Sequence, residues 1–131
     1  MKAEQERGAV DEMLEKFGAA VSSGDLAGVS KHYAYPVLML SDGGARMFKK
    51  PAELEAMFAE GREWYDISKG MLEARSELQE FEQLTEQTAA VTVRWLGYDS
   101  AGHKIYSGKW YYVIQDFEGV PLIRVALTRT K

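Results

Sequence analysis

The sequence predicts an α+β protein, on three observations. Apolar residues recur with a helical period through the first half of the chain, interrupted by one short hairpin pattern. From about residue 74 onward the period changes to two, and turn residues recur between the apolar runs. Because helices and long strands occupy separate stretches of the chain, the pattern indicates the α+β class.

Two helices are expected first. The first carries an apolar stripe at the spacing i, i+3, i+4, i+7 and i+11, and Gly24 is suited to end it. Asp25 can cap a second, shorter helix, and Pro36 marks the exit from that helix. The stripe of the first helix is Val10, Met13, Leu14, Phe17 and Val21, and that of the second is Leu26, Val29 and Tyr33.

A short hairpin and a third helix are expected next. Residues 37–40 and 45–48 read as strands on either side of the turn sequence SDGG at 41–44. Pro51 suits the first turn of a helix that could extend to about Ser68. The apolar stripe of this helix is Leu54, Met57, Phe58 and Tyr65.

Four long strands in a meander are expected at residues 74–84, 88–98, 103–115 and 120–129. A turn over 99–102 pairs Val91 with Trp110 and Trp95 with Tyr106, which gives one apolar face. A turn over 116–119 adds three residues to this face, which the helices should cover. The added residues are Ile123, Val125 and Leu127, whereas Thr92, Arg94, Lys109, Tyr111, Arg124 and Thr128 fall on the other, outer face.

The strand at 74–84 allows two registers. A two-residue turn sets Glu77 opposite Arg94 and turns Glu80 inward. A three-residue turn sends Phe81 and Gln79 inward and leaves the glutamates in water. Burying an unpaired carboxylate costs several kcal/mol or forces its protonation, which favours the second register.

The composition excludes several kinds of function. The 131 residues include no cysteine, so disulfides, thiol nucleophiles and thiolate metal sites are excluded. The net charge of −4 and the scattered Lys and Arg residues argue against nucleic-acid binding. No run approaches the ~20 apolar residues that span a bilayer, and the N-terminus lacks the apolar core of a signal peptide. We therefore expect one cytoplasmic domain over residues 1–131, with no membrane or nucleic-acid partner and no cofactor.

Aromatic residues on the predicted apolar face are the main candidates for a site. Tyr106 and Tyr112 each carry a hydroxyl group that needs a partner when buried, and together with Trp95 and Trp110 they exceed what a small core packs easily. Core packing and ligand contact both remain open for these rings. Glu80, if it points inward, would be a carboxylate beside Trp110 that could act as a base.

A metal site is not expected. His32 and His103 are the two histidines of the chain, and they fall at a helix end and beside a turn. Neither has the company of ligands that a metal ion needs. Arg129 is the basic residue expected to point inward near the end of the sheet.

The order of elements resembles a known superfamily. The residues that carry the resemblance are the junction SSGDL at 22–26, the segment YAYP at 33–36, the Pro-led third helix and the segment YSGKWYYVIQDFEGVPLIRV at 106–125. This layout resembles the nuclear transport factor 2-like superfamily, and within it the SnoaL-like and ketosteroid-isomerase-like branch. The Trp-Arg-Ile that usually follows the last glycine turn is replaced here by LIR at 122–124.

The resemblance implies three N-terminal helices packed in a strongly curved, mainly antiparallel sheet, a cone-shaped α+β barrel with a pocket at its open end. It also implies a homodimer formed through the outer sheet face. The isomerase mechanism does not transfer directly, because residues 37–40 and 46–48 contain no acid. The pocket residues expected from this layout are Tyr33, Trp95, Tyr106, Trp110 and Tyr112.

Three hypotheses about function follow. The first is a domain that binds a small apolar or aromatic molecule in the cone. The second is an isomerase or dehydratase that uses Glu80, and the third is a dimeric protein-interaction module without catalysis. The sequence does not identify the ligand, the reaction or the pathway.

Overall fold

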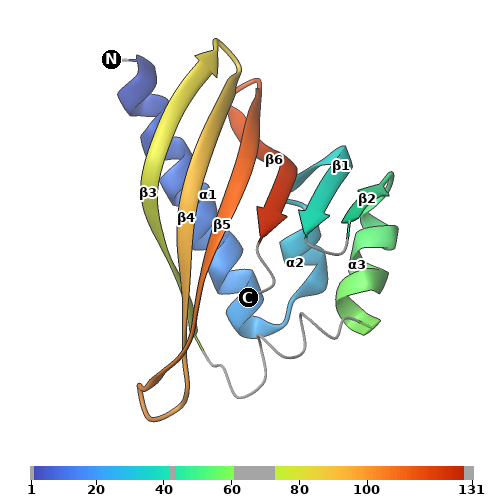
Figure 1. Ribbon diagram of the computed structural model, residues 1–131, viewed down its shortest axis with the longest axis vertical. Helices are drawn as coiled ribbons and strands as arrows, with labels where there is room; N and C mark the ends of the chain where they lie inside the picture. Colours follow the sequence, from blue (N-terminus) through green and yellow to red (C-terminus); the bar gives the residue numbers. More distant parts are fainter. Residues whose placement is uncertain (1, 42–43, 61–72, 129–131) are drawn as a thin grey trace.

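The computed structural model describes residues 2–41, 44–60 and 73–128. Within them the chain forms three helices and six strands, which confirms the predicted α+β class (Figure 1). The helices are α1 (Lys2–Ser23), α2 (Leu26–Ser30) and α3 (Pro51–Glu60). The strands are β1 (Tyr33–Ser41), β2 (Gly44–Phe48), β3 (Glu73–Thr85), β4 (Thr88–Tyr98), β5 (Lys104–Phe117) and β6 (Val120–Thr128).

The six strands form one curved sheet in the order β2-β1-β6-β5-β4-β3. Neighbouring strands are antiparallel except β1 and β6, which run parallel. The sheet is not closed, so β2 and β3 are its two edges. In Figure 1, α1 lies along one face of β3, β4 and β5, whereas α2 and α3 lie near β1 and β2. We call the face toward α1 the inner face and the opposite face the outer face.

The first helix forms as its apolar spacing predicts. Val10, Met13, Leu14 and Phe17 are buried, and Val21 packs against the core that they form. The helix ends before Gly24, whose positive φ of 71° suits a residue without a side chain.

Among the helices described, none is both long and apolar enough to cross a membrane.

The second helix is shorter than its apolar spacing predicts. The Asp25 carboxylate caps it by accepting a hydrogen bond from the Gly28 N–H at 3.0 Å, as expected. The helix ends at Ser30, however, and Tyr33 and Pro36 belong to β1. The expectation that Tyr33 lies on this helix is wrong because the chain pairs with β6 instead, and a local periodicity does not reveal that distant partner.

The hairpin β4–β5 keeps the predicted faces but not the predicted pairs. Trp95 lies opposite Gly108 rather than Tyr106, and Trp110 lies opposite Val93 rather than Val91. The offset is two residues, and an even offset leaves every side chain on its own face. A bulge at Ile105 next to the turn accounts for the remaining irregularity of this pair of strands.

A bulge in β6 inverts part of the predicted inner face. Ile123 is fully buried on the inner face, as expected, but the register shifts between the partners Ile123 and Val125. Val125 and Leu127 therefore lie on the outer face, and the prediction that placed them inward is wrong. A two-residue offset at the β5–β6 turn and the bulge together bring Thr128 opposite Trp110 instead of Ser107. Thr128 therefore lies on the inner face, and the prediction that placed it on the outer face is wrong.

The two registers considered for β3 both occur, one in each half of the strand. Glu77 lies opposite Arg94, which belongs to the first register, and Phe81 lies opposite Val91, which belongs to the second. A bulge at Gln79 separates the two halves, and this residue is exposed rather than inward. As the second register predicts, Glu80 is exposed and Phe81 packs against the core.

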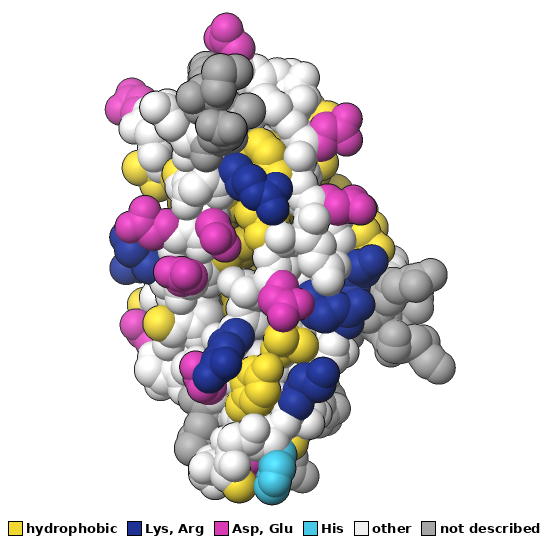
Figure 2. Space-filling model, turned by 90° about the vertical axis from the view of Figure 1, so that its left-hand side faces the viewer, with side chains coloured by type: hydrophobic (Ala, Val, Ile, Leu, Met, Phe, Trp, Pro, Cys, Tyr) yellow, Lys and Arg dark blue, Asp and Glu magenta, His cyan; other side chains and the backbone are white. Residues whose placement is uncertain are grey.

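The edge strand β3 carries exposed charges along much of its length. Charged side chains on an edge oppose pairing with another sheet. Figure 2 looks at the molecule from this side and shows charged side chains bordering a band of hydrophobic ones. The exposed charged residues of β3 are Glu73, Arg75, Glu77, Glu80 and Glu82.

Two predictions concern residues that lie outside the described ranges. They are the continuation of α3 to Ser68, with Tyr65 in its apolar stripe, and the inward direction of Arg129.

Candidate functional site

The candidate site is a row of aromatic side chains on the inner face. Tyr106, Trp110 and Tyr112 leave β5 on the same side, because alternate residues of a strand share a face. Tyr112 belongs to the buried core together with Trp95 and Tyr33, and Tyr106 and Trp110 pack against that core. The structure therefore brings all five predicted pocket residues to one side of the sheet.

Two indole-to-hydroxyl hydrogen bonds order this row. The Trp95 Nε1–H donates to the Tyr112 hydroxyl oxygen at 2.8 Å, and the bond is buried. The Trp110 Nε1–H donates to the Tyr106 hydroxyl oxygen at 3.2 Å. Between the two bonds, the rings of Trp110 and Tyr112 stack with centroids 6.1 Å apart and planes 22° apart. Each ring thus fixes the position of the next.

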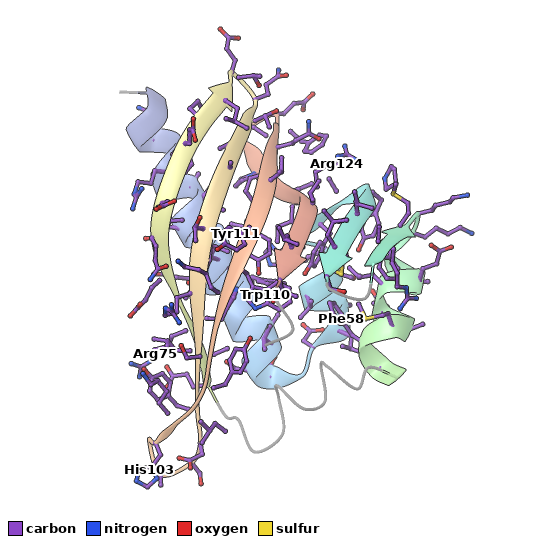
Figure 3. The ribbon with its side chains drawn as sticks, in the orientation of Figure 1. Phe58, Arg75, His103, Trp110, Tyr111 and Arg124 are labelled. Atoms are coloured by element: carbon purple, nitrogen blue, oxygen red, sulfur yellow. The ribbon has the colours of Figure 1, made fainter. Side chains whose placement is uncertain are left out.

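Burial changes gradually along the row. Trp95 and Tyr112 are 7% and 3% exposed, so they belong to the closed interior. Tyr106 and Trp110 are only half-buried. In Figure 3, Trp110 lies midway along β5, well away from His103 at the tip of the β4–β5 hairpin. The row therefore extends from the core to a partly accessible aromatic surface.

Phe17 connects the row to α1. Its ring makes edge contacts with Trp95 and Tyr33, with centroids 5.5 and 5.7 Å away, and with His32 at 5.8 Å. Edge-to-face contacts of this kind are a favoured aromatic geometry. The base of the row is therefore locked between α1 and the sheet.

Burial favours the neutral form of two phenols at the base of the row, Tyr33 and Tyr112. Burial is the main cause that raises the pKa of Tyr33 well above its usual range, and nearby Tyr112 adds to the shift. Burial likewise raises the pKa of Tyr112, more than the hydrogen bond from Trp95 lowers it. These hydroxyl groups are suited to donate hydrogen bonds and not to act as phenolate bases.

Gly108 is a packing position beneath the ring of Tyr106. It lies on the inner face between Tyr106 and Trp110, and the end of the Tyr106 ring lies directly over it. A Cβ at residue 108 would overlap the hydroxyl end of Tyr106. The alternation of residues in the strand places Gly108 on the same face as Tyr106 and Trp110, but it does not indicate that a ring of the same strand covers the glycine.

Glu80 lies away from the aromatic row. It is exposed on the outer face, where the Thr92 hydroxyl donates to its carboxylate at 3.5 Å. Among residues 5–41, 44–59 and 73–128, no Asp or Glu is buried. The part of the inner site formed by these residues consequently offers hydroxyl donors but no buried carboxylate.

A polar cluster joining α2, α3 and β1 was not predicted. The buried Ser30 hydroxyl donates to the Glu55 carboxylate at 2.6 Å, and the Tyr35 hydroxyl donates to the Ser30 carbonyl at 2.8 Å. Burial raises the pKa of Tyr35 to about 12. These residue types stand far apart in the sequence and follow no motif, so no signal in the sequence indicates the cluster.

The histidines lie apart from each other and from any group of ligands. His32 is buried against Phe17, whereas His103 is exposed beside Asp99 in the β4–β5 turn. Burial, then Lys31 and Lys16, lower the pKa of His32. Over residues 2–41, 44–60 and 73–128, no group of three His, Asp or Glu side chains is placed to hold a metal ion.

The outer face contains a hollow of about 550 Å³. Its floor is largely apolar, and it includes Val125 and Leu127, which the bulge in β6 turns outward. Tyr111 lies here too, as predicted, one residue from Trp110 in the chain but on the opposite face. Acidic Glu80 and Glu82 stand on the β3 side of the hollow.

Comparison with known families identifies the fold. A sequence model described as NTF2-like protein (DUF6841) matches residues 4–129. Among curated proteins, none matches the chain.

Several solved structures share the fold at low sequence identity. An NTF2-like protein of unknown function from Shewanella oneidensis superposes with a TM-score of 0.73 at 17% identity, covering 94% of this chain and 98% of that one. A domain of unknown function with a cystatin-like fold from Nostoc punctiforme gives 0.74 at 16%, covering 95% and 76%. A ketosteroid isomerase-like protein from Erwinia carotovora atroseptica gives 0.63 at 13%, covering 93% of each chain. These similarities establish the fold alone.

Proposed function

The chain belongs to the NTF2-like protein family DUF6841, and from this premise we propose that it binds a small, mainly apolar or aromatic molecule against the inner face of its sheet. The observation that carries the proposal is the graded aromatic row. Trp95 and Tyr112 anchor it in the core, and Tyr106 and Trp110 present ring surface that is only half-buried. Apolar walls with a few placed polar groups are typical of small-molecule sites.

The same site favours binding over isomerase chemistry. An isomerase of the ketosteroid type needs a carboxylate base that faces an apolar pocket. Glu80 is exposed on the opposite face of the sheet, so it does not supply that base. The likeness to a ketosteroid isomerase-like structure supports a shared fold, while a SnoaL-like activity stays a prediction.

Equilibrium dialysis with 2-isopropylnaphthalene tests the proposal. The variant Trp110→Ala removes the half-buried ring and is expected to weaken binding about tenfold, because both ring area and stacking are lost. Tyr111→Ala is the matched control, since it removes the neighbouring ring from the outer face and should leave binding unchanged. If wild-type protein does not bind the probe, or both variants bind like wild type, the proposal is wrong.

A second proposal concerns the outer face, which we assign to a second copy of the chain. Its apolar hollow includes Leu127, which is 38% exposed, together with Val125 and Tyr111. The face also carries both signs of charge, acidic on β3 and basic at Arg94 and Lys109. A two-fold axis pairs a surface with itself, and a face with both signs can be complementary to its own copy.

Sedimentation velocity at micromolar concentration tests the dimer. Wild-type protein is expected to sediment as a dimer, and Leu127→Lys as a monomer, because the lysine would place a charge in the apolar hollow. Ile105→Lys is the control, because Ile105 is also exposed but lies beside the β4–β5 turn. A monomeric wild-type protein would overturn this use of the face.

A further inference from the structure

The two edges of the sheet differ in regularity and in charge. In Figure 1, β2 and β3 lie on opposite sides of the molecule, and each is the last described strand on its side of the sheet. β3 contains two shifts in register, and four of its five exposed charged residues are acidic. β2 pairs with β1 without a shift over Gly44–Phe48, and four of its five residues are exposed. Bulges and mixed charges protect an edge from pairing, so β2 is the edge that is suited to accept a further strand.

The β2 edge is basic. The sequence GARMFKK at residues 44–50 contains three cationic residues and no acid, although the whole chain has a net charge of −4. Arg46, Lys49 and Lys50 are exposed, and no ion pair involves them in the part of the chain that the structure describes. The Glu53 carboxylate lies beside them, where it accepts a hydrogen bond from the Lys49 backbone N–H at 2.7 Å. Charge of one sign repels a second copy of this edge but attracts an acidic segment.

The two faces of β2 differ in chemistry. Ala45 lies opposite Leu40, which lines the outer hollow, so Ala45 and Met47 belong to the outer face. Met47 is 55% exposed. Arg46 shares the inner face with Phe48, and its guanidinium carbon lies over that ring, 4.8 Å from the centroid. A strand added beside β2 would place alternate side chains next to Arg46 and next to Met47, which favours a sequence of alternating acidic and apolar residues.

We infer that the β2 edge binds an extended acidic segment of another protein, in which acidic and apolar residues alternate, as an added strand. Hydrogen bonds between the two backbones supply affinity in this mode of recognition, and alternate side chains supply specificity. Three cations beside one short strand do not form the broad basic surface that binds nucleic acid, so a peptide is the better fit. The inference goes beyond the proposed small-molecule binding and does not depend on the aromatic row.

An NMR titration of the ¹⁵N-labelled protein with the end-capped peptide Val-Glu-Val-Glu-Val-Glu tests the inference. We expect saturable binding with a Kd below about 1 mM, and the largest shifts in the backbone amide signals of Gly44–Phe48. The peptide Val-Lys-Val-Lys-Val-Lys has the opposite charge and should not bind. The acidic peptide with every backbone nitrogen methylated keeps its charge but cannot donate to a neighbouring strand, so it should bind at least about tenfold more weakly.

Charge reversal on each edge of the sheet locates the site. Arg46→Glu should weaken binding of the acidic peptide at least about tenfold, because it places a carboxylate next to those of the peptide. Arg75→Glu is the matched control, since it reverses an exposed arginine on the opposite edge strand and should leave binding unchanged. Lys50→Glu, at an exposed residue just before α3, should weaken binding about threefold.

Each outcome supports or overturns the inference. Failure of the acidic peptide to bind at millimolar concentration overturns it, as do shifts centred on β3 instead of β2. Equal binding of the N-methylated peptide would show attraction between charges without an added strand, and the inference would be wrong. Tighter binding of a short single-stranded DNA than of the peptide would assign the edge to phosphates and overturn it too. Should Arg46→Glu fail to fold, Lys50→Glu decides against the same Arg75→Glu control.

Discussion

Gly18 of α1 lies directly against the ring of Trp95. A Cβ at residue 18 would lie 3.2 Å from Cζ3 of that ring and 2.9 Å from the carbonyl oxygen of Ala74. The missing side chain lets α1 approach β3 and β4 closely enough to cover the base of the aromatic row. The contact between a helix glycine and a strand tryptophan thus sets the distance between the two layers.

Gly18→Ala is expected to destabilise the fold, although alanine is the better helix former by about 1 kcal/mol. The new methyl group would meet the backbone of β3, which cannot rotate away, so we expect a net loss of about 1 to 3 kcal/mol. Chemical denaturation measures the free energy of unfolding. Gly8→Ala is the matched control, because a Cβ there meets nothing within 4 Å, and it should stabilise the same helix slightly. Equal effects of both changes would contradict the close approach at Gly18.

Gly108→Ala is expected to displace Tyr106 and break its bond with Trp110. The cost should be about 1 to 2 kcal/mol of unfolding free energy, measured by chemical denaturation. The same change in a Tyr106→Ala background has no ring to displace, and its cost should disappear there. A cost that is equal in both backgrounds would show that Gly108 matters for another reason.

The faces of β4 and β5 were predictable because the side-chain period of a strand survives an even shift in register. Trp95, Trp110 and Tyr112 were assigned correctly to the inner face although two of the proposed pairs were wrong. The candidate aromatic row therefore followed from the alternation of apolar residues. What the pattern could not contain was the direction of the hydrogen bonds along the row.

The bulges were not predictable, because distant contacts accompany them. Arg124 stands at the bulge in β6, where its guanidinium donates to the Gln115 side chain at 2.7 Å and to the Pro36 carbonyl at 2.9 Å. Beside the bulge at Gln79, the Arg7 guanidinium of α1 donates to the Leu78 carbonyl at 3.3 Å. Such partners lie 71 and 88 residues away in the chain, beyond the reach of a periodic pattern.

Ser30→Ala is expected to destabilise the junction of α2 and α3. The change removes the donor at 2.6 Å from the Glu55 carboxylate, and bonds to charged groups contribute about 1.5 to 3 kcal/mol. Glu55→Gln should cost less, because the amide oxygen can still accept from Ser30. Urea denaturation of Ser30→Ala, Glu55→Ala and their double mutant gives the coupling between the two residues, because each of these two changes removes the bond. Ser23→Ala, at an exposed serine of α1, is the control, and a zero coupling energy between Ser30 and Glu55 would rule out the bond as a stabilising link.

His32 is expected to make the fold less stable in mildly acidic solution. Its folded pKa is lowered from 6.5 by burial and then by Lys31 and Lys16, so the unfolded chain binds a proton at this residue more readily than the folded chain. Above pH 6.5 the residue is neutral in both states and contributes no pH dependence. As the pH falls from 6.5 toward the lowered pKa, stability should decrease, and below that pKa the decrease should stop.

Unfolding free energies measured between about pH 5 and pH 8 give the slope of stability against pH. His32→Gln should flatten the slope in this window, whereas His103→Gln, at an exposed residue, should leave it unchanged. A slope that persists in His32→Gln would assign the pH dependence to another group.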